Sequence, residues 1–146
     1  MPPATQTHDR WAFLTTMGQI AQRNLHPFRA DIAMDIGSTR PGWMVDKCPC
    51  LTARRAATGG HWISSRGRRT SLGEMLRLQG FKPALVQTGE MSAPAMGRLV
   101  GNAMSVNVLE RLLLRLLPAV GLAQPERLRA RWESAQMAKL AIREHF

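Results

Sequence analysis

The stretch Arg-Arg-Thr-Ser-Leu-Gly-Glu-Met-Leu-Arg-Leu-Gln-Gly-Phe, residues 68–81, carries the strongest local structural signals of this 146-residue chain. Ser71 and Glu74 form an S-x-x-E capping box, in which the hydroxyl and the carboxylate each accept a hydrogen bond from a backbone amide at the helix start. A short helix is therefore predicted to begin after Ser71. It is predicted to end at Gly80, because glycine readily adopts the left-handed conformation that closes many helices.

A second helical region is predicted after a loop over residues 82–90. Ser92 is a suitable N-cap for it. Gly101-Asn102 is expected to interrupt this region, and an apolar helix is expected from Met104 to Leu117, ending at Pro118. Leucine and valine occupy almost its whole circumference, so we expect this helix to be buried on most sides.

The N-terminal part of the chain alternates between helix-like and strand-like patterns. A helix is predicted from Asp9, its N-cap, to about Asn24. Its apolar stripe comprises Trp11, Leu14, Met17, Ile20 and Ala21. Residues 30–36 alternate apolar with small or acidic side chains, which predicts a half-buried strand, and residues 43–69 have short strand-like signals.

The composition indicates a polyanionic partner. The net charge is +10, and only three of the 20 basic residues are lysines. Arginine offers a planar fork that suits phosphate and guanine, although a compositional bias of the coding sequence, indicated also by the absence of tyrosine, explains the arginines equally well. The candidate nucleic-acid contacts, chosen from the basic segment around Trp62, are Arg54, Arg55, His61, Arg66, Arg68 and Arg69.

Within the cluster 66–69, three guanidiniums are expected to outnumber the local carboxylates, because the nearest one, on Glu74, is engaged in its capping box. His61 next to Trp62 is more often a packing residue than a contact to a base. A solvated charge run is the alternative to a phosphate site in this segment.

Membrane, metal and nucleophile signals are weak. No apolar run approaches the roughly 20 residues that span a bilayer, and residues 1–10 lack the layout of a secretory signal, so we expect an intracellular protein, nuclear if the source is eukaryotic. Cys48 and Cys50 are too close to bridge to each other. No neighbour is identifiable that would activate either thiol, and the scattered histidines predict no metal site. We therefore predict no catalytic residue.

Three segments resemble C5-cytosine DNA methyltransferases. Residues 68–81 are similar to the ninth conserved motif of that family, and Gly-Asn-Ala-Met-Ser-Val-Asn-Val-Leu, residues 101–109, is similar to the tenth. Pro-Cys-Leu-Thr, residues 49–52, is similar to the Pro-Thr-Leu-Thr that often closes the target-recognition region. The order and spacing of the three segments agree with the family over roughly residues 31–121.

The resemblance implies a partial Rossmann-like, S-adenosylmethionine-dependent enzyme that flips a cytosine out of DNA and methylates it. Phe81 matches the aromatic that packs against the methyl donor, and Asn102 the asparagine that helps to hold it. Gly101 and Ala103 flank that asparagine, although some relatives have serine in place of Ala103. Lys82 replaces the proline that usually follows Gly-Phe.

Four motifs of the family have no counterpart in these 146 residues. They are Phe-x-Gly-x-Gly, Pro-Cys-Gln, Glu-Asn-Val and Gln-x-Arg-x-Arg. Methyl transfer to cytosine C5 needs a thiolate nucleophile and a general acid, so the chain is expected to be inactive alone and to bind no S-adenosylmethionine by itself.

The sequence therefore predicts a small, mainly helical α+β fold with a few short strands. It is divided into an N-terminal helix and tail (1–29), a basic short-strand segment (30–69), the helical methyltransferase motifs (70–121) and a charged C-terminal helix (122–146). The predicted function is that of a C-terminal fragment or decayed relative of a cytosine methyltransferase. Its expected partners are DNA, bound weakly, and the missing catalytic half or another protein at the helix Leu109–Leu117. The alternative is a non-catalytic basic module that binds nucleic acid or protein.

Overall fold

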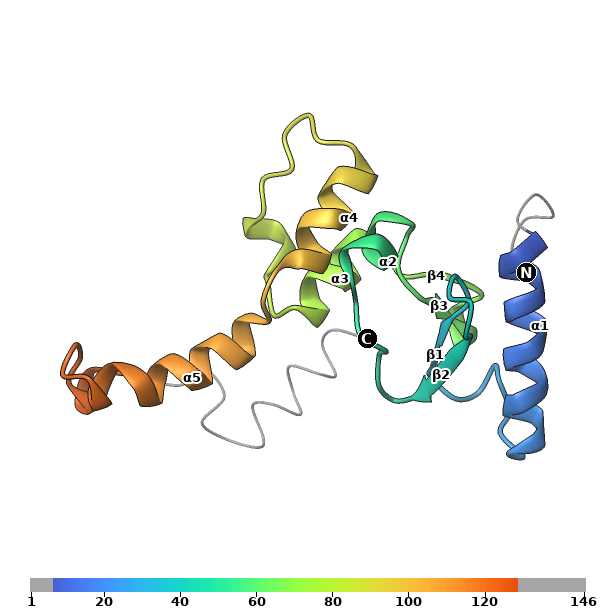
Figure 1. Ribbon diagram of the computed structural model, residues 1–146, viewed down its shortest axis with the longest axis horizontal. Coiled ribbons are helices and arrows are strands. Elements are labelled where there is room, and N and C mark those ends of the chain that lie inside the picture. The colour runs from blue at the N-terminus through green and yellow to red at the C-terminus, as the bar shows by residue number, and fades with distance from the viewer. Residues whose placement is uncertain (1–6, 129–146) are drawn as a thin grey trace. The chain divides into compact units, whose positions relative to one another are not determined.

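The computed structural model describes residues 7–128, which form two compact units (Figure 1). Unit 1 comprises the chain up to Met75 together with Gln87–Asn102, and unit 2 comprises Leu76–Val86 and the residues from Ala103 on. In chain order the elements are α1 (Thr7–Gln22), β1 (Ile32–Asp35), β2 (Gly42–Val45), α2 (Ala53–Ala57), β3 (Trp62–Ile63), β4 (Arg68–Arg69), α3 (Leu72–Leu78), α4 (Ala93–Asn102) and α5 (Val106–Ala119). Short 3-10 turns occur at Ser64–Arg66, Pro83–Leu85 and Pro125–Arg127.

The four strands of unit 1 form one sheet in the order β2-β1-β3-β4, and every neighbouring pair is antiparallel. Met34 of β1 is opposite Trp43 on one side and opposite Trp62 on the other. The predicted α+β class is confirmed. A Rossmann-like sheet is mainly parallel, so the Rossmann-like part of the prediction finds no support within residues 7–128.

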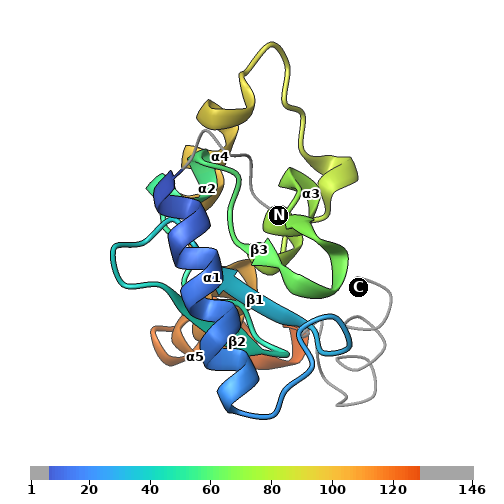
Figure 2. The ribbon, with the colours of Figure 1, turned by 90° about the vertical axis from the view of Figure 1, so that its right-hand side faces the viewer.

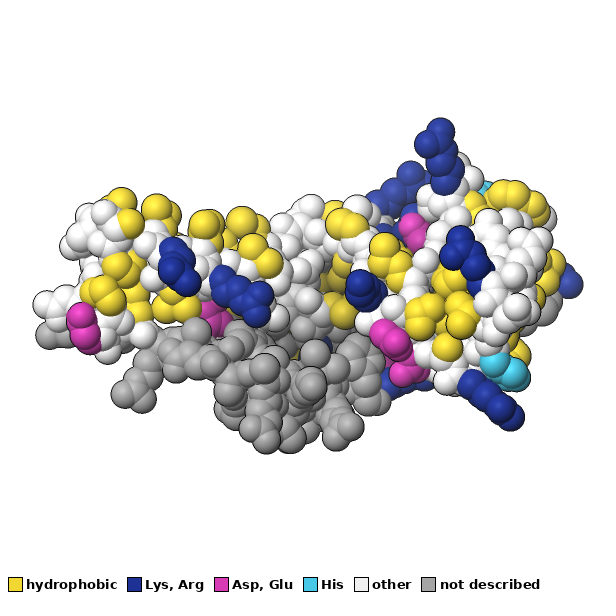
Figure 3. Space-filling view, turned by 90° about the horizontal axis from the view of Figure 1, so that it is seen from below, with side chains coloured by type: hydrophobic (Ala, Val, Ile, Leu, Met, Phe, Trp, Pro, Cys, Tyr) yellow, Lys and Arg dark blue, Asp and Glu magenta, His cyan; other side chains and the backbone are white. Residues whose placement is uncertain are grey.

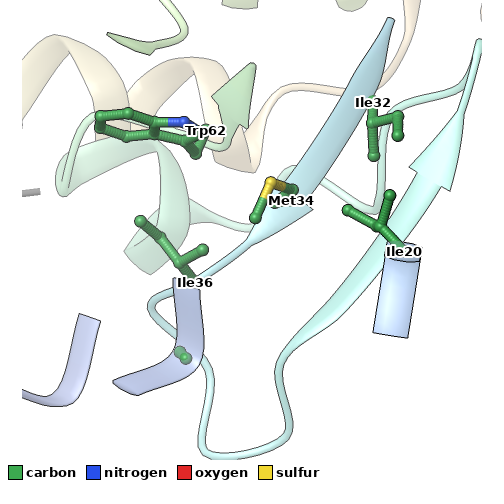
Figure 4. Close-up of a cluster of buried hydrophobic side chains, with 6 residues drawn as sticks. Ile20, Ile32, Met34, Ile36 and Trp62 are labelled. Atoms are coloured by element: carbon green, nitrogen blue, oxygen red, sulfur yellow. The ribbon is translucent and has the colours of Figure 1, made fainter. Parts of the chain in front are cut away.

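The core of unit 1 lies between α1 and the sheet (Figure 2). Ile20 of α1 packs with Ile32, Met34 and Ile36 of β1 and the following turn, and Trp62 of β3 completes the cluster (Figure 4). Trp62 is also in edge-to-face contact with Phe13, with 5.6 Å between the ring centroids. The predicted half-buried strand is wrong in one respect: Ala33, on the opposite face of β1, is buried as well.

The buried face of α1 differs from the predicted stripe. Ala12, Thr16 and Ile20 are buried, whereas Trp11 and Leu14 are 53% and 56% exposed. Small side chains at Ala12 and Thr16 allow the helix to lie close to the sheet, and the Thr16 hydroxyl donates to the Ala12 carbonyl over 2.7 Å, which satisfies its polar group inside the helix. The helix already includes Thr7, so Asp9 lies in its first turn and is not its N-cap.

Helix α2, which was not predicted, packs against α4. The Thr52 side chain caps it by accepting from the Arg55 amide over 3.3 Å. A Cβ added at Gly97 of α4 would lie 2.3 Å from the Ala56 carbonyl oxygen, and one added at Gly101 would lie 2.5 Å from Cα of Ala53. Both glycines are therefore required for the close approach of the two helices.

The predicted capping box and helix stop are confirmed. The Glu74 carboxylate accepts from the Ser71 amide over 2.7 Å, and the Ser71 hydroxyl accepts from the Glu74 amide over 3.2 Å. Gly80 follows α3 in the left-handed region, with φ +83°, and the Phe81 amide donates to the Leu76 carbonyl over 2.9 Å. These are the hydrogen bonds and the backbone conformation of a glycine-terminated helix.

Helix α5 of unit 2 is amphipathic and exposed. It continues to Ala119, so Pro118 lies in its last turn. Leu112 and Leu116 are 55% and 48% exposed, and Figure 3 shows hydrophobic side chains along this helix next to basic ones. The expectation that α5 is buried on most sides is wrong for the part of the chain that the structure describes. The predicted charged C-terminal helix (122–146) lies mostly outside the described residues.

Candidate functional site

Two of the methyltransferase-like segments meet within unit 2. The Val106 amide donates to the Gln79 carbonyl oxygen over 2.8 Å. A Cβ added at Gly80 would lie 2.9 Å from Oδ1 of Asn107 and 3.2 Å from Cβ of Val106. The turn after α3 thus packs against the start of α5, which joins Gln-Gly-Phe of the first segment to Val-Asn of the second.

The four candidate cofactor residues are divided between the units. Phe81 and Ala103 belong to unit 2 and are half-buried, whereas Gly101 and Asn102 are the last residues of α4 in unit 1. Asn102 is exposed. The absence of a side chain at Gly101 is explained by its contact with Thr52 and Ala53 of unit 1, independently of any ligand.

The arginine cluster next to α3 is largely paired with carboxylates. Arg68 makes a two-point contact with Glu74, with 2.8 Å from Nη1 to Oε2 and 2.9 Å from Nη2 to Oε1. Arg66 also bonds to Glu74, and Arg69 pairs with Asp9 of α1. The three guanidiniums outnumber the local carboxylate, as expected, but all three are paired, because Glu74 serves two of them and Asp9, sixty positions before Arg69, serves the third.

The electrostatic effect of this cluster falls mainly on Glu74. Hydrogen bonding to Arg68 lowers the pKa of the Glu74 carboxyl to about 2, the bonds from Ser71 act in the same direction, and partial burial opposes them. The carboxylate is thus charged at every physiological pH. It holds together the start of α3 and the arginines that precede it.

Two further candidate arginines, both on α2, differ in their surroundings. Nε of Arg55 lies 2.7 Å from Oδ1 of Asp35, and both side chains are largely buried. A Cβ added at Gly37 would lie 2.2 Å from Nη1 of Arg55, so the guanidinium is enclosed by the turn after β1. Arg54 is exposed. Of the two, only Arg54 is open to a phosphate in this structure.

His61 is fully buried, and neither of its ring nitrogens has a hydrogen-bond partner among residues 7–128. Burial lowers the pKa of the imidazole, and Arg55 adds to this, while Asp35 and the carbonyls of Pro49 and Cys50 act in the opposite direction. A buried neutral imidazole cannot reach a base or a phosphate from solvent. The structure therefore places His61, like Trp62, in the packing of unit 1.

Cys48 lacks the lowered pKa of a nucleophilic cysteine. Cys48 and Cys50 are free thiols. Burial, followed by the influence of Cys50 and Asp35, raises the pKa of the Cys48 thiol to about 11, whereas a reactive cysteine needs a lowered pKa. Within the described residues, no three histidine, cysteine or acidic side chains are grouped in a way that could hold a metal ion.

An open groove in unit 1 is lined by residues that no sequence pattern indicated. Gln19 of α1, Arg23 just after this helix, all four residues of β2 and Lys47 surround a volume of about 570 Å³. Arg23 and Lys47 are exposed, and Nε1 of Trp43 donates to Oε1 of Gln19 over 3.2 Å. Because 24 positions separate Arg23 from Lys47, no local sequence motif identifies this groove.

No protein-family model matches the chain, and no curated protein and no solved structure is similar to it. Among residues 7–128, none of the helices combines the length and the apolar character that crossing a bilayer requires.

Proposed function

We propose that this chain is the C-terminal part of a C5-cytosine DNA methyltransferase, as a fragment or a decayed relative, and that it is inactive by itself. The observation that supports this proposal best is the contact between the two motif-like segments in unit 2. The Val106 amide bonds to the Gln79 carbonyl over 2.8 Å, and Gly80 leaves room for the Asn107 side chain. The contact brings together the two segments that, in the proposal, contribute to one methyl-donor pocket.

In this proposal Phe81 packs against the methyl donor, Asn102 helps to hold it, and Gly101 and Ala103 position that asparagine. The group that they would bind is S-adenosylmethionine, which supplies the transferred methyl group. In this proposal the residues of this chain bind and orient the methyl donor. The raised pKa of Cys48 argues against this thiol as the covalent nucleophile, and neither Cys48 nor Cys50 stands in a Pro-Cys-Gln motif.

The exposed face of α5 agrees with a missing catalytic half. Val108, Leu112 and Leu116 project from this helix with 60%, 55% and 48% of their surface exposed. Apolar side chains repeated at this spacing form a continuous surface that is normally covered by other protein. In the proposal, the rest of a methyltransferase domain covers it.

Two calorimetric titrations with S-adenosylmethionine test the proposal. The chain alone should give no heat of binding. In the second titration, the chain is mixed with a C5-cytosine methyltransferase that has been truncated before its ninth motif. This mixture should bind the methyl donor, and Phe81→Ala should abolish the binding. Phe13→Ala, in the core of unit 1, serves as a destabilising control. A stable mixed complex without affinity for the methyl donor would refute the proposal.

The second candidate function is a non-catalytic interaction module that binds a protein through α5 or nucleic acid through its basic residues. It is favoured by the exposed leucines of α5 and by the exposed Arg54. Sedimentation separates the two candidates. An assembly that forms through α5 and is unchanged by DNA or by removal of residues 122–146 supports the interaction module.

A further inference from the structure

The geometry points to the free edge of β2 as a docking site for an extended acidic segment of a partner protein, which would add a fifth strand to the sheet. This inference does not rest on the proposed function, because it concerns only unit 1. Within the described part of the chain, the strand order β2-β1-β3-β4 leaves β2 with a neighbour on one side only. Such an edge is a template for a further strand.

The hydrogen-bond register identifies which backbone groups of β2 are free. The Asp46 amide donates to the Asp31 carbonyl over 2.9 Å, which makes these two residues a hydrogen-bonded antiparallel pair. Such pairs alternate along a ladder, so Met44 bonds to β1 and the pairs Ile32–Val45 and Met34–Trp43 do not. The amides and carbonyls of Trp43 and Val45 therefore point away from β1, and they have no hydrogen-bond partner in the described part of the chain.

This edge lies in the groove described above. Successive side chains of a strand point to opposite faces, yet all four residues from Gly42 to Val45 line the same groove. A groove that runs along the edge of the strand would contact residues that point to either face. A segment that occupies the groove is thus in position to bond to the free groups of Trp43 and Val45.

The charges along the groove favour an acidic occupant. Arg23 and Lys47 line it, are exposed, and take part in no ion pair within the described residues. By contrast, Arg55, Arg66, Arg68 and Arg69 all have carboxylate partners. A second copy of the chain is disfavoured as the occupant, because each copy has a net charge of +10 and the two would repel each other.

An extended peptide is also a better fit than nucleic acid. Main-chain hydrogen bonds to a peptide use the four free backbone groups of β2, and carboxylates at alternate positions reach the two cations. A nucleic acid would use the cations but leave the row of alternating donors and acceptors unpaired. The occupant that satisfies both features is a strand with acidic side chains.

A capped heptapeptide of alternating glutamate and valine serves as the probe, with an alternating lysine and valine peptide as its counterpart. We expect the acidic peptide to bind to the full chain and to slow hydrogen exchange of the Trp43 and Val45 amides, with little effect on the Met44 amide, which is already bonded to β1. The lysine peptide should not bind. Equal binding of both peptides, or binding without protection of these two amides, would overturn the inference.

Three variants sharpen the test. Val45→Pro removes one outward-pointing amide and leaves the ladder to β1 intact, since proline is tolerated at a free edge. Its matched control, Val45→Ala, trims the side chain and keeps the amide. We expect Val45→Pro and the double variant Arg23→Glu with Lys47→Glu each to weaken peptide binding by about tenfold or more, equivalent to about 1.4 kcal/mol, and Val45→Ala to stay within about twofold of the unmodified chain.

Two outcomes would assign the groove to a different occupant and so overturn the inference. In the first, a ten-nucleotide oligothymidine displaces the acidic peptide but leaves the Trp43 and Val45 amides unprotected. This result would indicate a nucleic-acid site at Arg23 and Lys47. The other is protection of these amides that rises with protein concentration in the absence of peptide, which would indicate pairing between two copies of β2.

Discussion

Glu74 and Arg68 are joined by two hydrogen bonds, of 2.8 and 2.9 Å, between one carboxylate and one guanidinium. The same carboxylate accepts the Ser71 amide over 2.7 Å. A single side chain therefore caps α3 and fixes the strand β4 that precedes it.

The first prediction concerns acid stability. The pKa of Glu74 is lowered from 4.5 to about 2 in the folded protein, so the unfolded chain takes up a proton first as the pH falls. The stabilisation by Glu74 is complete above pH 4.5 and is lost between that value and about pH 2. Glu74→Gln should be less stable at pH 7 and should show a flatter pH dependence in this interval, measured by urea unfolding. Glu90→Gln, at an exposed loop position, should behave like the unmodified chain, and an equal slope for all three proteins would contradict the prediction.

The second prediction concerns His61 and lies in a higher pH range. Burial lowers the pKa of His61 in the folded protein below its ordinary value of 6.5. Between the folded and the unfolded pKa, the unfolded chain therefore binds a proton that the folded chain does not. Stability should decrease as the pH falls below about 6.5. His61→Leu should remove this decrease, whereas His26→Gln, at an exposed position, should retain it. Thermal unfolding at pH 7.5, 6.5 and 5.5 measures the effect, and an unchanged slope in His61→Leu would count against it.

The third prediction compares two helical glycines. Gly97→Ala should destabilise the protein by about 1–3 kcal/mol, the usual range for overpacking, because its Cβ would lie 2.3 Å from the Ala56 carbonyl oxygen. Gly18→Ala in α1 meets nothing within 4 Å and should stabilise the protein by about 0.5–1 kcal/mol through its higher helix propensity. Urea unfolding of both variants decides between them. A Gly97→Ala variant as stable as the unmodified chain, or more stable, would show that the α2–α4 contact is looser than the structure indicates.

The fourth prediction concerns the contact between the two motif-like segments. Gly80 and Gly89 both have positive φ, +83° and +51°, so alanine at either position costs about 1–2 kcal/mol in backbone conformation. A Cβ at Gly80 would in addition lie 2.9 Å from the Asn107 side chain, whereas one at Gly89 meets nothing within 4 Å. Gly80→Ala should therefore cost more than Gly89→Ala. If the Val106 amide loses its protection from hydrogen exchange in Gly80→Ala but not in Gly89→Ala, the additional cost arises at the contact between the two segments.

The fifth prediction concerns α5. Because Leu112 and Leu116 are exposed, their joint replacement by glutamine should change the free energy of unfolding, measured by urea unfolding, by no more than about 0.5 kcal/mol. Ile20→Ala, at a fully buried position, should cost about 2–5 kcal/mol. A loss of more than about 1 kcal/mol in the double leucine variant would show that this face is packed within the chain.

Local signals were sufficient to predict several elements. The capping box of Ser71 and Glu74 and the stop at Gly80 depend on groups within ten residues of one another, and the structure has both. The same holds for Ser92, whose hydroxyl accepts from the Ala95 amide over 3.4 Å at the start of α4. Such hydrogen bonds join residues that are close in the sequence, and therefore a sequence pattern identifies them.

Features that depend on distant partners could not be predicted. Helix α2 has five residues and only Ala56 is buried, so its stability comes from α4, about forty positions later. The buried face of α1 is defined by Ala12 and Thr16 because the sheet lies against them, while the larger Trp11 and Leu14 face solvent. The pairing of Arg69 with Asp9 likewise has no local signature, and this is why the basic segment looked more open to phosphate than it is.

The division of the chain into units has a consequence for its synthesis. Unit 1 is built from two stretches, and Gln87–Asn102 belongs to it although the chain has already entered unit 2 at Leu76. During translation, α2 thus emerges long before α4, whose Gly97 and Gly101 lie against it. The surface of α2 that later contacts α4 stays uncovered until residue 102 has left the ribosome, and surface that is exposed in this way is where a nascent chain is prone to aggregate.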